Sequence, residues 1–301
     1  MWPTEDEGGR GFAAGRSAPH SRRGTLAHVP TSALLLALAA AVGHALWNML
    51  LARARDPEAA TAIAMLVGVL VFALPAALAW EVDRSVWPYV IGSSLFELVY
   101  IALLAAAYRR SELSLVYPLA RGGAPVLVLV VGVAFLGAST SAAQAAGVCL
   151  IAAGIVLIRG LRADADRGGV AFGLAIAACI AGYTLIDNGG VERANPLAYL
   201  ELVMIVPAFG YAAGVLAAGG TSAFRAELNV SSLVAGLLIL SPYALFLFAL
   251  DLASAAPVAA VRETSVVVAT ALGALVLKER VRRPRWAGAL VVAGGVALLS
   301  L

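Results

Sequence analysis

The sequence predicts an all-α integral membrane protein in which ten transmembrane helices form two inverted five-helix repeats. Three observations lead to this prediction: the composition, a series of ten long apolar segments and a faint internal repeat. Of the 301 residues, 61% are hydrophobic and only 13% are charged, and the mean hydropathy is +0.91. Soluble domains are about half apolar and about one quarter charged. The polar residues are too few to cover a soluble globule, so the chain is expected to lie in a lipid bilayer.

Ten apolar segments are long enough to cross the hydrocarbon core of a membrane, which takes about 20 residues of helix. Short polar breaks separate these segments from one another. We predict transmembrane helices at 31–52, 59–80, 86–108, 113–136, 141–159, 169–188, 196–218, 231–251, 254–277 and 284–301.

Residues 1–30 differ from the rest, because they are rich in Gly, Ser, Arg and acidic residues and show no apolar periodicity. We expect them to form a disordered tail. The alternative, that the first apolar segment is a cleaved signal peptide, is less favoured. That segment has about 20 residues and ends in polar residues, whereas the apolar part of a signal peptide has about 7–15.

The internal repeat relates residues 31–159 to residues 169–301. Matches among Gly, Pro, Met and Arg carry the repeat, because such residues are informative inside apolar segments. Arg121, Gly132, Gly147 and Gly154 recur 141 positions later as Arg262, Gly273, Gly288 and Gly295, and Gly43, Pro57 and Met65 recur 139 positions later as Gly182, Pro196 and Met204. Each repeat holds five spans, and five is odd, so the second copy enters the membrane from the opposite side. Inverted repeats are typical of secondary transporters, whose substrate site lies between the repeats near the midplane.

Lys and Arg in short loops predict the orientation, since cytoplasmic loops are enriched in them. The loops after odd-numbered spans carry 13 of these residues, and the loops after spans 2, 4, 6 and 8 carry 2. We therefore expect both termini outside the cytoplasm, although four arginines in residues 1–30 oppose this orientation. The expected location is a bacterial plasma membrane.

Two arginines are predicted to lie deep in the membrane at equivalent positions of the repeats. Arg121 follows the start of its span by eight residues, which is roughly 12 Å of helix at about 1.5 Å per residue. A central Arg costs about 2.5–3.5 kcal/mol on insertion scales, so Arg121 and Arg262 each need a partner or a wet cavity. Neighbouring prolines at 118, 125 and 257 predict kinks or breaks in both helices. A structural brace with a carboxylate and a contact to substrate both remain open for these arginines.

Glu97 is predicted to be the most deeply placed carboxylate, with Tyr100 on the same helix face. Three roles fit Glu97: a proton carrier, a cation contact, or a static partner of Arg121. Glu263 adjoins Arg262 in sequence, so a regular helix would direct the two side chains to different faces. Asp187 and Glu201 lie near helix ends, where we expect interfacial water to solvate them.

Polar residues at matching places in the two repeats suggest a lined cavity. His44, Trp47 and Asn48 share one helix face, and Tyr183 and Asp187 are the equivalents of His44 and Asn48. Hydrogen bonds within a packed bundle are the alternative explanation. The candidate substrate-binding residues are Arg121, Arg262, Glu97, His44, Trp47, Asn48, Tyr100, Tyr117, Tyr183, Asp187 and Tyr243.

No motif for soluble enzymes, metals or cofactors occurs in the sequence. A phosphate-binding glycine loop with Lys is absent, so ATP is not expected to drive the protein. The cysteines, Cys149 and Cys179, lie inside apolar segments and are expected to be free. The formal net charge of +3 gives no indication of nucleic-acid binding. We expect no cofactor, no catalytic residues and no metal.

Three segments carry a resemblance to a known family: GHALWNMLLARARDP from Gly43, VYPLARGGAPVLVLVVGVAFLG from Val116, and AAVRETSVVVATALGALVLKERVRRPRWAGALVVAGGVAL from Ala259. They resemble the drug/metabolite transporter superfamily, EamA type, over residues 31–301. In that family each repeat ends with an apolar helix, a Gly-Glu or Lys-Glu-Arg turn and a Gly-rich span. Lys278–Glu279–Arg280 fits this pattern, whereas Gly137–Ala138–Ser139 lacks the Glu.

The resemblance implies a secondary transporter of a small metabolite, an exporter or an exchanger, that works by alternating access. Family members move amino acids, metabolites, drugs or nucleotide sugars. A flippase for a lipid-linked sugar is the alternative, and a channel or an intramembrane enzyme is less favoured. Two buried arginines favour an anionic or zwitterionic solute, and Glu97 introduces proton coupling as an option. The sequence does not specify an oligomeric state.

Overall fold

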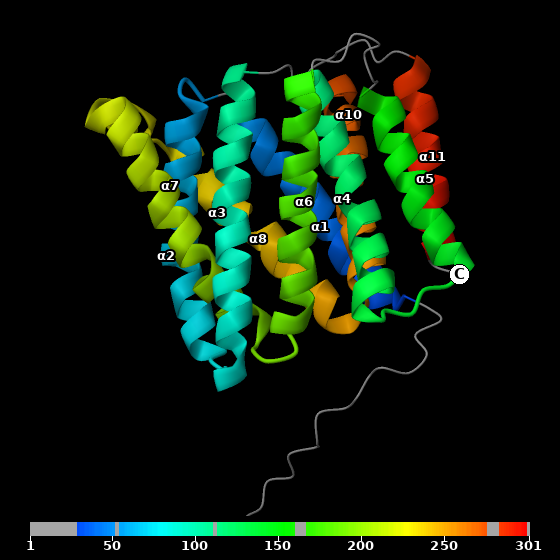
Figure 1. Ribbon diagram of the computed structural model, residues 1–301. Coiled ribbons are helices and arrows are strands. Elements are labelled where there is room, and N and C mark those ends of the chain that lie inside the picture. The colour runs from blue at the N-terminus through cyan, green and yellow to red at the C-terminus, as the bar shows by residue number, and fades with distance from the viewer. Residues whose placement is uncertain (1–28, 52–53, 111–112, 160–166, 276–282, 300–301) are drawn as a thin grey trace, which may run out of the picture.

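The computed structural model describes residues 29–51, 54–110, 113–159, 167–275 and 283–299. The regular elements of these residues are helices, which stand side by side in a bundle (Figure 1). The first half contains α1 (Thr31–Leu51), α2 (Pro57–Leu78), the short 3-10 helix η1 (Arg84–Val86), α3 (Trp87–Arg110), α4 (Leu113–Leu136) and α5 (Ala142–Arg159). The second half contains α6 (Arg167–Gly190), α7 (Pro196–Glu227), α8 (Val230–Leu252), α9 (Ala255–Arg262), α10 (Ser265–Leu275) and α11 (Arg283–Leu299).

Each predicted span coincides with one helix, except that the ninth is divided between α9 and α10. Six helical segments of the described residues are long and apolar enough to cross a membrane, and the apolar parts of α1, α5 and α11 are shorter. Residues 1–28 of the tail expected at 1–30, and the Lys-Glu-Arg motif at 278–280, lie outside the described residues.

The side chains on the outside of the bundle are suited to lipid. Leu70, Leu78 and Phe135 are large apolar side chains that are 77–81% exposed. Exposed apolar surface of this extent would aggregate in water, whereas hydrocarbon solvates it. Trp80 and Trp286 are also exposed and lie near helix ends, as expected for interfacial anchors.

The predicted interruptions near the two arginines differ between the halves. In the second half the helix breaks directly after Arg262, and Pro257 is accommodated in the first turn of α9, where a proline costs little. In the first half α4 is one continuous helix through Pro118 and Pro125, so a break is wrong there, whereas a kink stays a prediction. Membrane helices tolerate proline when neighbouring helices support them, and α4 packs along both α5 and α6.

The seventh helix runs further than the predicted 196–218. It continues to Glu227, but Gly220 interrupts it with φ 70° and ψ −179°. A positive φ of this kind suits glycine, which has no Cβ to clash with the backbone. The residues after Gly220 therefore form a separate short helical segment (Figure 1).

Glycines bring α5 and α11 into close contact (Figure 1). A Cβ on Gly147 would lie 2.8 Å from the carbonyl oxygen of Gly295, and a Cβ on Gly154 would lie 2.8 Å from that of Gly288. Small residues allow helix backbones to approach this closely in membranes. Gly147 precedes Gly154 in α5, whereas its partner Gly295 follows Gly288 in α11, so the two helices are antiparallel. These four glycines are also the ones that the internal repeat relates to one another.

Two loops are joined at one end of the bundle. Val82, between α2 and η1, forms an isolated antiparallel bridge with Ala194, between α6 and α7. The Asp83 N–H donates to the Arg193 carbonyl at 2.8 Å, and the Asn195 N–H donates to the Glu81 carbonyl at 2.8 Å. The loop that follows the second predicted span therefore lies on the same side as the loop that follows the sixth.

Candidate functional site

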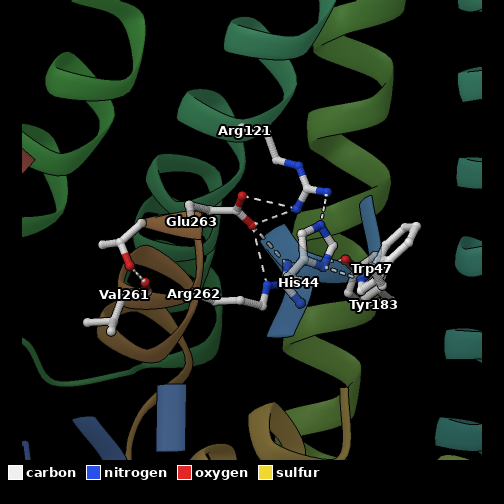
Figure 2. Close-up of polar contacts among 8 residues, drawn as sticks. His44, Trp47, Arg121, Tyr183, Val261, Arg262 and Glu263 are labelled. Atoms are coloured by element: carbon white, nitrogen blue, oxygen red, sulfur yellow. Dashed lines mark hydrogen bonds and ion pairs between the residues drawn. The ribbon is translucent and has the colours of Figure 1, made fainter. Parts of the chain in front are cut away.

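Arg121 and Glu263 form an ion pair in the interior of the bundle (Figure 2). The Nη1 atom of Arg121, on α4, donates to Oε1 and Oε2 of Glu263 at 3.2 and 3.1 Å. The side chains are only 7% and 1% exposed, respectively. A bond from an ionised donor to an ionised acceptor is about twice as strong as a neutral one, which is what a buried charge requires.

Arg262 contacts the same carboxylate. Its Nε and Nη2 atoms donate to Oε1 of Glu263 at 3.3 and 3.1 Å. The expectation that these neighbouring residues point to different faces is wrong. Glu263 is the C-cap residue of α9, with φ −70° and ψ −8°, and the contact is made by the ends of the two long side chains. One carboxylate is therefore shared by two guanidinium groups (Figure 2).

Aromatic rings surround the Arg262 guanidinium. It lies 4.1 Å from the centroid of the Phe246 ring, and its Nη2 donates to the Tyr183 hydroxyl at 3.1 Å. Cation–π contacts are strongest when the cation is desolvated, as it is here. The rings continue in a row, because Tyr183 is 6.2 Å from both Tyr100 and Tyr243. This row gives the site an apolar wall next to its charges.

His44 contacts Arg121 from α1. The Nε2 atom of His44 lies 2.7 Å from Nη2 of Arg121. A guanidinium can only donate, so Nε2 must be the unprotonated nitrogen of a neutral imidazole and Nδ1 must carry the proton. The indole N–H of Trp47, 3.3 Å from Nδ1, then meets another donor, and we assign this contact to edge-to-face ring packing at 5.0 Å. Neutral His44 therefore helps to fix the position of Arg121.

Asp187 is the centre of a second polar cluster. Ser93 Oγ and Tyr199 OH donate to its Oδ1 at 2.5 and 2.9 Å, and Tyr243 OH donates to its Oδ2 at 2.7 Å. The expected solvation at the interface is wrong for Asp187, which has no exposed surface. Because these donors come from α3, α7 and α8, the packing of neighbouring helices encloses the carboxylate although it lies close to the end of α6.

Glu201, for which we also expected interfacial water, is only 8% exposed. Its Oε2 atom has no hydrogen-bond partner among the described residues. The expectation of solvation is wrong here as well, because Glu201 is buried and α7 packs against α2 and α3.

Glu97 is buried near both clusters. It is 7% exposed, and the charged groups that act on it are Asp187, Arg262 and Arg121. The cluster as a whole therefore contains two guanidinium groups and three carboxyl groups, those of Glu97, Asp187 and Glu263. The carboxylate that is seen to bond to Arg121 is that of Glu263.

The structure brings together nine of the eleven predicted residues. The side chains of Asn48 and Tyr117 lie outside the part of the chain that can be described. The sequence analysis missed Ser93, Tyr199 and Phe246, and it did not identify Glu263 as a partner. Only Ser93 carried a usable signal, since it precedes Glu97 by one helical turn. The described residues contain no cluster of His, Cys, Asp or Glu that could hold a metal ion.

Comparison with known proteins identifies the chain. The sequence model of the EamA-like transporter family matches it twice, over residues 31–160 and 167–301. No curated protein shows significant sequence similarity to it. Among 26 matching chains of solved structures, one crystal structure, whose description names no activity, covers 90% of this chain and 98% of its own length. The TM-score is 0.73 at 16% identity, which shows a shared fold. The chain is a membrane transporter of the EamA-like family, in the drug/metabolite transporter superfamily.

Proposed function

We propose that the protein is a secondary transporter that moves a small anionic or zwitterionic metabolite by alternating access. One observation carries this proposal: Arg121 and Arg262, at equivalent positions of the repeats, converge in the buried interior on one carboxylate. Guanidinium groups match carboxylates in shape and charge, and an ionisable side chain within a membrane is a functional candidate by default. The proposed binding residues are those of the two polar clusters, with Asn48 and Tyr117 retained from the sequence.

The proposed architecture is ten spans in two inverted five-helix repeats. The antiparallel contact of α5 with α11 supports it, because an axis in the membrane plane would relate Gly147 to Gly288 and Gly154 to Gly295. The Val82–Ala194 bridge supports it as well, since both loops follow even-numbered spans. We place the repeats at 31–159 and 169–301 and the protein in a bacterial plasma membrane, with its termini outside.

We also propose that Glu97 carries a coupled proton. The buried cluster has two permanent positive charges, from Arg121 and Arg262, and three carboxyl groups. Two ionised carboxylates balance the arginines, so a third charge in this environment would be uncompensated and costly. A proton on Glu97 removes that charge, and releasing it on the other side of the membrane would link solute movement to a pH gradient.

The test is transport by the purified full-length chain in proteoliposomes. Radiolabelled carboxylates, amino acids and neutral sugars are screened for saturable counterflow, which separates a carrier from a channel. Arg121→Ala is expected to abolish counterflow of an anionic or zwitterionic solute while the thermal stability stays near that of the wild type. Arg84→Ala, at the exposed start of η1, is the matched control.

A purely structural brace gives the opposite pattern. Arg121→Ala would then unfold the protein, and replacing both Arg121 and Glu263 by Gln would restore stability and transport together. That result would place the substrate site elsewhere.

A further inference from the structure

We propose that Glu263 is an internal counter-ion that the solute's carboxylate displaces from the two arginines. The inference rests on the proposed function, because it assumes that Arg121 and Arg262 bind an anion. Without solute, Glu263 occupies the position between Arg121 and Arg262 that the solute's carboxylate would take. In the loaded transporter the solute holds it, and the Glu263 side chain has moved away.

The contacts of Glu263 support a shared position. Its Oε1 accepts from both Arg121 and Arg262, and its Oε2 accepts from Arg121, all at 3.1–3.3 Å. A carboxylate held between two guanidiniums is also the arrangement that an anionic solute would adopt. Two carboxylates in the same place would repel each other in a low-dielectric interior, so the two occupants must exclude each other.

The two halves differ in that only the second places a carboxylate beside its buried arginine in sequence. The repeat equivalent of Glu263 is Gly122, which has no side chain and lies within the continuous helix α4. The carboxylate that bonds to both arginines therefore comes from the second half. A solute that replaces Glu263 keeps the charge balance of the arginine pair, and only anionic solutes can do so.

The position of Glu263 in the backbone connects its displacement to movement. It lies between α9, which ends at Arg262, and α10, which begins at Ser265. Thr264 Oγ1 donates to the carbonyl of Val261 at 2.7 Å, and Thr264 is 5% exposed. The ion pair with Arg121 ties this junction to α4. Displacing Glu263 breaks the tie, so binding of the solute would free the junction between α9 and α10 to move.

Benzoate is a suitable probe, because it combines a carboxylate with a ring that fits the aromatic wall, and benzamide is its neutral counterpart. Binding to the purified full-length chain in nanodiscs is measured by calorimetry. Glu263→Gln removes the competing charge and is expected to tighten benzoate binding by about tenfold or more, the effect of losing one charge-assisted competitor. Benzamide binding should not change. Glu201→Gln, which alters another buried carboxyl group, is the matched control.

Unchanged or weaker benzoate binding in Glu263→Gln, or no benzoate binding in either protein, would overturn the inference. If Glu263→Gln does not fold, a second measurement tests the inference in a chain that keeps Glu263. Benzoate should increase maleimide labelling of Thr264→Cys, in a chain whose Cys149 and Cys179 are replaced by Ala, because the junction opens. Labelling that benzoate leaves unchanged would also contradict displacement.

These outcomes separate the inference from the proposed function. Counterflow that depends on Arg121, combined with no gain in affinity in Glu263→Gln, rejects displacement and keeps the transporter. Tighter benzoate binding in Glu263→Gln without counterflow of any solute rejects the proposed transport and keeps displacement.

Discussion

The Arg121 guanidinium and the Glu263 carboxylate pair across the two halves of the chain, although 142 positions separate them in sequence. Arg121, in the first half, therefore depends on a carboxylate from the second half, whereas Arg262 pairs with Glu263 within its own half. The ion pair of the site therefore forms only when the two halves pack together. The interior ion pair between Arg121 and Glu263 is thus one of the contacts between the two halves.

Glu97→Gln is expected to uncouple transport from the pH gradient. The amide cannot take up or release a proton, so accumulation driven by a pH gradient should be lost. Counterflow at equal pH on both sides should persist, because it needs no net proton movement. Both are measured in proteoliposomes, with Glu201→Gln as a buried carboxyl control. A pH-driven accumulation that survives in Glu97→Gln would remove Glu97 from the mechanism.

Tyr243→Phe is expected to destabilise the protein by leaving one oxygen of buried Asp187 without its donor. The expected loss is about 1–3 kcal/mol, the cost of an unsatisfied buried polar group. Unfolding in detergent is followed for Tyr243→Phe, Asp187→Asn and the double variant. The loss from Tyr243→Phe should shrink in the Asp187→Asn background, because the two residues act through one hydrogen bond. Additive losses would show that this bond does not hold the α6–α8 contact.

Gly295→Ala is expected to lower stability by about 1–3 kcal/mol through overpacking. A Cβ at this position would lie 2.7 Å from Cγ1 of Ile151 and 2.8 Å from the Gly147 carbonyl oxygen, so α5 and α11 must separate. Gly294→Ala is the matched control, since its Cβ meets no atom within 4 Å. That control should be neutral or gain up to about 1 kcal/mol, because alanine favours helix over glycine. Equal melting temperatures for the two variants would rule out a close contact between the glycines.

Val82→Cys with Ala194→Cys is expected to form a disulfide that arrests transport. The two residues face each other as a pair without direct hydrogen bonds, the arrangement in which antiparallel side chains are closest. The loops must separate if the central site opens toward this face. Transport is measured before and after reduction, in a chain whose Cys149 and Cys179 are replaced by Ala. Full transport by the oxidised pair would mean that this face does not open at the bridge.

The loop charges predict that the C-terminus faces away from the cytoplasm. A reporter that is active only in the cytoplasm, fused after Leu301, is expected to stay silent. Cysteine labelling in intact cells provides the complement, because a cysteine at Val82 should react with an impermeant reagent and one at Arg55 should not. Strong reporter activity, or the reverse labelling pattern, would overturn the orientation.

The positions of the helices follow from the sequence because the physical rule behind them is local. An apolar segment of about 20 residues has no water to satisfy its backbone, so it can only be helical. Residues 113–136 were predicted as a span, and α4 has the same limits. Arg121 and Arg262 stand out for the same reason, since a charge deep in such a segment is too costly to be incidental.

Tertiary structure alone decided which groups meet. Nothing local indicates that Glu263 serves both arginines, because its direction depends on the end of α9 and on α4 packing beside it. The enclosure of Asp187 is also non-local, since Ser93, Tyr199 and Tyr243 arrive from three other helices. Pro118 and Pro125 predicted a kink or a break in α4, and the helix is unbroken where it packs against α5 and α6. The sequence by itself determined where the helices lie and which charged residues are buried in the membrane. Packing between distant segments determined the partners of those residues.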